Sequence, residues 1–227
     1  MARRRTYGDR CGIARALDLV GERWALLVVR ELLLGPKRFT DLREGLPHVS
    51  PDVLSQRLRE LEDSDVLRRA KLPPPAGSRV YELTDRGLEL EPVILALGRW
   101  GSGAPFPPGD AKLGSDSAVI ALMTVFDPSA ADGLNASYEL RLGKDRFRAR
   151  VAAGRIEFAR GSAEEPDATI ETDPETLSAV LWQGRRLAEA ERAGDVRIEG
   201  SRRAATRFLG LFALPEPAAA AVERASE

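Results

Sequence analysis

The pattern of apolar positions predicts two helices near the start of the chain. Apolar residues first recur with spacing i, i+3, i+4 and i+7: Ile13, Ala16, Leu17 and Val20. This spacing predicts an amphipathic helix that ends at Gly21. The run 24–34 is apolar on nearly every side except at Arg30 and Glu31, which predicts a central buried helix closed by Gly35 and Pro36. We expect these two helices to form the core of the first half.

Two further helices are expected before residue 65. Phe39 and Leu42 favour a short helix at 39–43, with Thr40 as its cap. Ser50 followed by Pro51 is a strong helix start, because a serine side chain caps the first turn and a proline there needs no N–H. We expect this second helix to run to about residue 63.

The helix that begins after Ser50 has two chemically different sides. Its apolar residues fall on one stripe: Leu54, Leu58 and Leu61. Polar residues project the opposite way or lie beside that face: Asp52, Ser55, Gln56 and Arg59. At 100° per residue the outward side is therefore short, polar and able to form hydrogen bonds.

A hairpin and a last helix follow. Residues 66–71 and 79–83 have the pattern of β-strands, and the proline-rich segment 72–78 is expected to join them as a stiff tip. Thr84 caps a final helix whose apolar side is wide enough for both a core and a partner: Leu88, Leu90, Val93, Ile94, Leu97 and Trp100. This order of elements is that of a winged helix.

Glycines and prolines divide the chain after Trp100. We place a first domain at 1–102, a linker at 103–116, a second domain at 117–214 and a tail at 215–227. In the second domain, residues 138–142, 147–151 and 155–159 alternate in polarity and predict a three-stranded antiparallel meander. The run 119–126 is either a helix or a strand.

More strands and helices complete the second half. Residues 168–172 and 196–200 add a fourth and a fifth strand, and helices are expected at 173–182 and 201–211. The fold class is therefore α+β: a winged helix followed by an α+β domain with a sheet of about five strands.

Charge and composition narrow the possible functions. The net charge is −1, but residues 1–109 carry 18 Lys and Arg against 15 Asp and Glu, and the rest carries 16 against 20. A polyanionic partner is therefore expected on the first half. With one Cys and one His, the chain lacks the ligands of a Cys-rich zinc site, and we expect no metal or cofactor. The second half has neither residue and no Gly-rich phosphate loop, so we expect no enzyme.

The chain also lacks the features of a membrane or exported protein. No run approaches the roughly 20 apolar residues of a membrane span. The start, with Arg3, Arg4 and Arg5, lacks the apolar stretch of a secretory signal. We therefore expect a cytoplasmic protein.

Several segments together resemble one known family. Residues 21–24, 27–39, 50–61 and 80–87, with Trp100 and Gly101, resemble the HxlR family of winged helix-turn-helix regulators over about residues 8–102. The resemblance implies a sequence-specific transcriptional regulator, and we expect it to be a repressor. It implies a homodimer held by the first and last helices, with two recognition helices in successive major grooves of a palindromic operator on double-stranded DNA.

The resemblance assigns roles to particular residues. The candidates for contacts with base edges lie on the helix after Ser50: Ser50, Asp52, Ser55, Gln56 and Arg59. The candidates for contacts with phosphates are cationic: Lys37, Arg38, Arg57, Arg68, Lys71 and Arg79. Asp52 departs from this logic, because phosphates repel a carboxylate. It either accepts from a cytosine amine or supports the helix dipole. Asp65 replaces the glycine usual in the turn, so a left-handed backbone is expected there.

Cys11 supports an alternative mode of regulation. Some members of the family use a cysteine near the N-terminus as a thiol switch, and Arg10 and Arg15 lie close to Cys11 in sequence. The alternative is therefore a redox-responsive regulator switched through Cys11, with a purely structural second domain. A passive thiol at the dimer helix is the other interpretation.

The second half resembles the sterol-carrier-protein fold across about residues 115–214, chiefly in segments 167–177 and 194–204. The resemblance implies a pocket for a lipid-like or hydrophobic effector, with these lining candidates: Leu122, Phe126, Phe147, Phe158, Leu181, Phe208 and Phe212. The residues themselves show only apolar helix faces over a sheet. A filled core, in a domain that serves for dimerisation or as a spacer, stays open.

Overall fold

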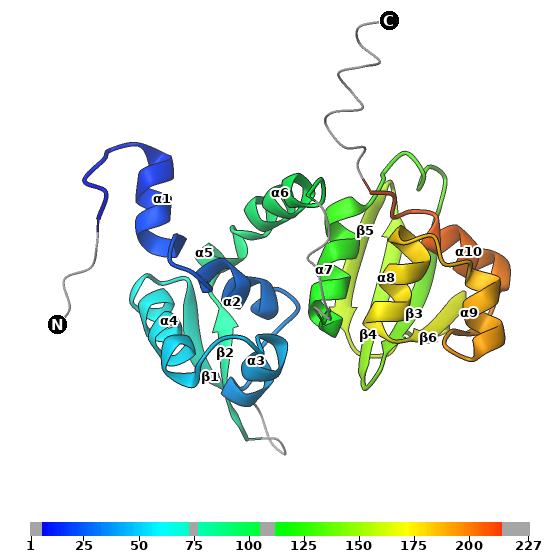
Figure 1. Cartoon of the computed structure of the whole chain (residues 1–227), viewed down its shortest axis with the longest axis horizontal. Coiled ribbons are helices and arrows are strands. Elements are labelled where there is room, and N and C mark those ends of the chain that lie inside the picture. Colours follow the sequence, from blue (N-terminus) through cyan, green and yellow to red (C-terminus); the bar gives the residue numbers. More distant parts are fainter. Residues whose placement is uncertain (1–5, 73–76, 105–111, 215–227) are drawn as a thin grey trace, which may run out of the picture. The chain divides into compact units, whose positions relative to one another are not determined.

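The first part of the chain consists of helices and one short hairpin (Figure 1). The elements follow in this order: α1 (Gly12–Val20), α2 (Ala25–Leu32), α3 (Phe39–Gly45), α4 (Pro51–Asp63), β1 (Leu67–Lys71), β2 (Arg79–Leu83), α5 (Asp85–Leu88) and α6 (Glu91–Gly101). This computed structural model describes residues 6–72, 77–104 and 112–214. The order of elements confirms the predicted winged helix.

The chain divides into two units, residues 1–94 and 95–227. The division falls within α6, whereas the sequence places the first domain at 1–102 and a linker at 103–116. The predicted boundary stays a prediction, because residues 105–111 of the linker lie outside the described residues. The predicted tail, residues 215–227, also lies outside them.

The first core is built by α2 and α4, with the hairpin beside them. Its most buried side chains are at most 2% exposed: Val28, Val29, Leu32, Leu54, Leu58 and Leu61. The prediction that α1 shares this core is wrong for most of that helix. Only Val20 of α1 is buried, whereas Ile13 is 72% and Leu17 is 42% exposed. The apolar stripe of α1 therefore faces away from the core of its own chain.

The predicted last helix is two helices in the structure. Thr84 caps α5, since its Oγ1 accepts a hydrogen bond from the Gly87 N–H at 3.1 Å. A proline in the interior of a helix clashes with the carbonyl four residues earlier, whereas one in the first turn is tolerated. Pro92, the second residue of α6, therefore prevents one unbroken helix: α5 ends at Leu88 and α6 begins at Glu91. The predicted cap of α3 is also wrong: Arg38, not Thr40, is the capping residue, and its N–H donates to Asp41 Oδ2 at 3.1 Å.

The hairpin is the wing of the fold. Strands β1 and β2 pair antiparallel, from Leu67 opposite Leu83 to Lys71 opposite Arg79. Lys37 adds a further rung, because its backbone exchanges two hydrogen bonds with Tyr81, at 3.0 and 2.8 Å. Residues 73–76 of the predicted proline-rich tip lie outside the described residues.

The second unit is a mixed sheet with helices. Its elements are α7 (Ser115–Val125), β3 (Ala136–Leu142), β4 (Asp145–Ala152), β5 (Arg155–Arg160), β6 (Ala168–Thr172), α8 (Pro174–Trp182), α9 (Leu187–Ala193), β7 (Arg197–Gly200) and α10 (Arg202–Leu209). The strand order is β5-β4-β3-β6-β7, and only the pair β3 and β6 is parallel. The predicted meander is confirmed as β3 to β5. The undecided run 119–126 is helical up to Val125, and α9 was not predicted.

Candidate nucleic-acid interface

Helix α4 is fixed in one orientation by its cap and its apolar stripe. Ser50 Oγ accepts a hydrogen bond from the Val53 N–H at 3.3 Å, as the Ser-Pro pattern predicts. Leu54, Leu58 and Leu61 are at most 1% exposed. Because this stripe is buried, the opposite side of the helix must face solvent.

The exposed side of α4 carries the residues predicted to contact bases. Asp52, Gln56 and Arg59 are exposed, and Ser55 beside them is half-buried. Gln56 Nε2 donates to Glu60 Oε1 at 2.9 Å, and Arg59 Nε donates to the Ser55 carbonyl at 3.2 Å. An amide and a guanidinium on one helix face are the groups that pair with adenine and guanine in the major groove.

Four of the predicted phosphate contacts are exposed in the first unit: Arg38, Arg68, Lys71 and Arg79. Arg68 Nε is bound to Glu82 at 2.7 Å. Lys71 and Arg79 are directly opposite each other at the end of the hairpin, and no carboxylate within the described residues pairs with either. Like charges placed opposite one another repel, so this end of the wing is suited to a polyanion.

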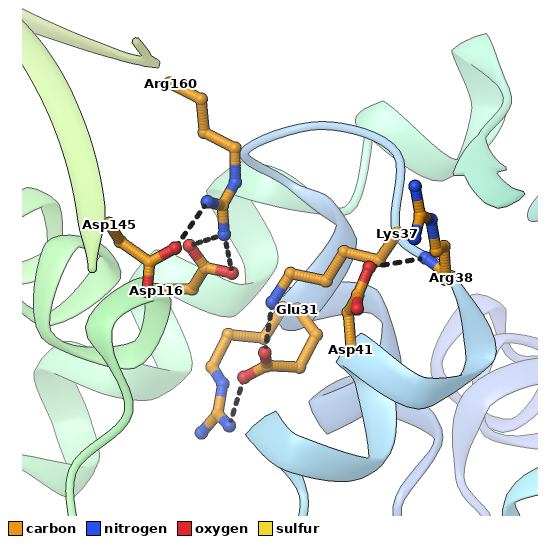
Figure 2. A network of polar contacts seen from close by, with 8 residues as sticks. Glu31, Lys37, Arg38, Asp41, Asp116, Asp145 and Arg160 are labelled. Atoms are coloured by element: carbon orange, nitrogen blue, oxygen red, sulfur yellow. Dashed lines mark hydrogen bonds and ion pairs between the residues drawn. The ribbon is translucent and has the colours of Figure 1, made fainter. Parts of the chain in front are cut away.

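The other two predicted phosphate contacts, Lys37 and Arg57, are buried, at 7% and 8% exposure. Lys37 Nζ lies 2.6 Å from Glu31 Oε2, and Arg30 binds the other oxygen of Glu31 at 2.8 Å (Figure 2). Arg57 is bound to Glu60 and lies 3.6 Å from Glu22. Both cations are therefore bound to carboxylates, so their assignment as phosphate contacts is less well supported than that of the four exposed cations.

Glu31 is the buried charge on which this network depends. Burial by itself would raise the pKa of Glu31, but the charges of Lys37 and Arg30 outweigh it and hold the pKa below its usual value. Gly45 leaves the carboxylate its space, because a Cβ at residue 45 would lie 2.2 Å from Glu31 Oε2. In the sequence, this buried ion-pair network was indicated only by the position of Glu31 within the otherwise apolar run 24–34.

Asp65 and Cys11 are the other two residues of the first unit that the sequence singles out. Asp65 has a φ of 56°, which confirms the left-handed turn expected after α4. Cys11 is exposed and is the residue just before α1.

The predicted pocket of the second unit is closely packed. Five of its candidates are buried: Leu122, Phe126, Phe147, Phe208 and Phe212. Phe158 and Leu181 are half-buried. The ring centroid of Phe208 lies 5.0 Å from that of Phe212 and 4.4 Å from that of Tyr138. A ligand that entered between these side chains would have to displace the rings. The hydroxyl of Tyr138 is buried there without a hydrogen-bond partner within the described residues.

Arg160 ties the sheet of the second unit to α7. Its NH2 group binds both oxygens of Asp116, and its NH1 group lies 3.2 Å from Asp145 Oδ1 (Figure 2). The guanidinium also lies 5.1 Å from the ring centroid of Phe147. Asp116 is in the first turn of α7, so the network links this helix to β4 and β5.

No helix in ranges 6–72, 77–104 and 112–214 is long and apolar enough to cross a membrane. Within these same ranges, no group of three or more His, Cys, Asp or Glu is placed to hold a metal ion.

A helix-turn-helix, here α3 and α4, followed by the β-hairpin of β1 and β2, is the arrangement of the winged helix-turn-helix class of proteins. Residues 19–105 match the family described as HxlR-like helix-turn-helix. The uncharacterized HTH-type transcriptional regulator YvaP of Bacillus subtilis is 38% identical over 86 residues, which are 38% of this chain and 80% of YvaP. The chain belongs to the HxlR-like helix-turn-helix family and is a transcriptional regulator of that type.

The chain is also similar to other proteins. The HTH-type transcriptional regulator YodB of Bacillus subtilis is 36% identical over 85 residues, 37% of this chain and 76% of YodB. A solved structure described as the reduced form of YodB has 34% identity and a TM-score of 0.38, and covers 45% of this chain and 100% of that one. Residues 118–224 match the family described as alkyl sulfatase C-terminal, which is consistent with the resemblance to the sterol-carrier-protein fold.

Proposed function

We propose that the protein is a repressor that binds a palindromic operator on double-stranded DNA as a homodimer. The observation that carries the proposal is the exposed face of α4. There, Gln56 and Arg59 present an amide and a guanidinium side by side, while the apolar stripe fixes the helix from behind. The helix provides base contacts, and the cations of the wing provide affinity that does not depend on sequence.

The wing supports this division of roles. Lys71 and Arg79 lie opposite each other without carboxylate partners in the described part of the chain, so a phosphate would relieve their repulsion. Arg38 and Arg68 supply further exposed positive charge. Each cation that neutralises a phosphate releases counterions, and binding should therefore weaken steeply as salt rises.

The homodimer is supported by exposed apolar side chains on the first and last helices of the winged-helix region. The largest are Ile13 and Leu17 on α1, and Val93, Leu97 and Trp100 on α6. Trp100 is 82% exposed, which is unfavourable for a large aromatic ring in a monomer. A second copy that covers these helices would remove them from water and would pair two α4 helices with two half-sites.

The experiment is a selection of DNA by the full chain from a library of randomised duplexes, followed by gel-shift titrations over a range of salt concentrations. We expect a symmetric sequence to be enriched and bound with a steep salt dependence. The variant Gln56→Ala with Arg59→Ala should still bind DNA but should enrich no sequence. If the unaltered protein binds all duplexes equally, the proposal is wrong.

We further propose that the second unit binds a hydrophobic effector. Support comes from the match to the alkyl sulfatase C-terminal family, whose name refers to substrates with an apolar chain. The unpartnered hydroxyl of Tyr138 offers such a ligand a hydrogen bond. Native mass spectrometry of the protein purified from cells should find a retained small molecule. Loss of that mass after organic extraction, with the dimer intact, is the expected control result, and a bare polypeptide mass would count against the effector.

Regulation through Cys11 is the alternative to regulation by an effector. The thiol is exposed at the start of α1, a helix that we propose for the dimer interface, so its oxidation would alter the pairing of two copies. In this case oxidants should release DNA from the unaltered protein and leave Cys11→Ser bound. An equal response of both proteins would eliminate this candidate.

A further inference from the structure

Glu60 connects a buried cation of α4 to one of its exposed polar side chains. Its Oε1 accepts a hydrogen bond from Gln56 Nε2 at 2.9 Å, and its Oε2 accepts one from the guanidinium of Arg57. Gln56 lies one turn before Glu60, and Arg57 lies three residues before it, so both contacts follow from helical spacing. Each oxygen of the carboxylate thus has a partner on the same helix.

Arg57 holds the carboxylate of Glu60 in place. The Arg57 side chain is only 9% exposed, and a second carboxylate, that of Glu22, lies 3.6 Å from its guanidinium. An exposed ion pair gains little, because two long side chains must be held in one geometry. Here the burial of the cation has already removed that freedom, so Glu60 is anchored at the edge of the exposed face.

The hydrogen bond from Gln56 leaves the correct groups free to read a base. A glutamine amide recognises adenine with its oxygen and one N–H at the same time. The amide has two N–H groups, and Glu60 uses one of them. The second N–H and the oxygen remain available, while rotation of the amide is restricted.

We propose that Glu60 is a positioning residue that sets the base preference of α4 by orienting the amide of Gln56. This inference rests on the proposed role of α4 in reading DNA. Arg59 provides an internal reference, because its Nε bonds to the Ser55 carbonyl and not to Glu60. Glu60 should therefore affect the base pair read by Gln56 and not the one read by Arg59.

The test uses the full chain and the library of randomised duplexes. The unaltered protein, Gln56→Ala, Glu60→Ala and Glu60→Gln are each used for selection, with Glu62→Ala as the matched control. Glu62 is on the same helix but pairs with Arg69, at 3.1 Å, so its loss removes the same charge without touching Gln56. Affinities are then measured on the selected duplex and on duplexes changed at single base pairs.

We expect Glu60→Ala to weaken the preference at the base pair read by Gln56 by roughly three- to tenfold, the effect of freeing one such side chain. The preference at the pair read by Arg59 should not change. Glu60→Gln retains an acceptor for the amide and should keep the preference to within about twofold. Glu62→Ala should alter neither preference. If Glu60→Ala does not fold, Glu60→Leu takes its place with the same expectation.

Three results would overturn the inference: an unchanged preference in Glu60→Ala, an equal loss at both base pairs, or no effect of Gln56→Ala. These results differ from a failure of the proposed function, in which the unaltered protein would select no sequence at all.

Discussion

Lys71 and Arg79 lie directly opposite each other at the end of the wing hairpin. Because the two cations have no carboxylate partners within the described residues, we expect both to be available to phosphates. Lys71→Ala and Arg79→Ala should each weaken binding to all duplexes alike. Each should also lower the slope of log affinity against log salt concentration by about 1.

The control for the wing variants is Arg192→Ala, which removes an exposed arginine from α9 in the second unit. Gel-shift titrations at several salt concentrations should give it the slope of the unaltered protein. A wing variant that changes the preferred sequence but not the salt slope would show that the wing reads bases instead.

Lys37 and Arg38 are adjacent cations with different expected roles. Lys37 is buried against Glu31, whereas Arg38 is exposed. Removal of one partner of a buried ion pair leaves the other charge uncompensated, so Lys37→Met should destabilise the protein by about 3 kcal/mol. Arg38→Met should leave stability unchanged and weaken DNA binding. Thermal unfolding and gel shifts of the two variants check this, and equal stability would refute the burial of Lys37.

The depressed pKa of Glu31 makes stability depend on pH. Its stabilising contribution is complete above the ordinary pKa of a glutamate, about 4.3, and is lost as the pH falls through the lower value of the folded state. The unfolding free energy should therefore decrease below about pH 4.3, and this decrease should be smaller in Glu31→Gln. Denaturant unfolding between acidic and neutral pH measures both, with the exposed Glu89→Gln as control.

Local patterns predicted those parts of the fold that local physics decides. The cap at Ser50 and the stripe of Leu54, Leu58 and Leu61 fixed the start and the facing of α4, because both depend on neighbours within a few residues. Alternation likewise predicted the meander. It did not predict that β6 pairs with β3 in parallel, since a strand does not encode its partner in its own pattern.

Burial was the feature that the sequence could not decide. In the sequence, Lys37 and Arg57 look like ordinary solvent-exposed charges. Only the folded structure shows that both are buried, next to the carboxylates of Glu31 and Glu22. Similarly, periodicity placed Phe147 and Phe208 on the apolar side of the second unit. It gave no information on whether that side encloses a space or is filled by other rings.

Tyr138→Phe tests whether that apolar side is filled. A buried hydroxyl without a partner costs free energy, so its removal should stabilise the ligand-free protein by about 1 kcal/mol. If a ligand or water binds the hydroxyl in solution, the same change should destabilise instead. Denaturant unfolding distinguishes the two results, with Tyr81→Phe on the wing as a control whose side chain is half-buried.

The turn after α4 stores strain that a single substitution should release. Asp65 has a φ of 56°, and a side chain in this left-handed region costs free energy that glycine avoids. Asp65→Gly should therefore raise the free energy of unfolding by about 1 kcal/mol. Asp63→Gly is the matched control: residue 63 is the last of α4, where glycine weakens the helix, so this change should lower stability. If Asp65→Gly left the free energy of unfolding unchanged or lowered it as Asp63→Gly does, the turn would hold no strain.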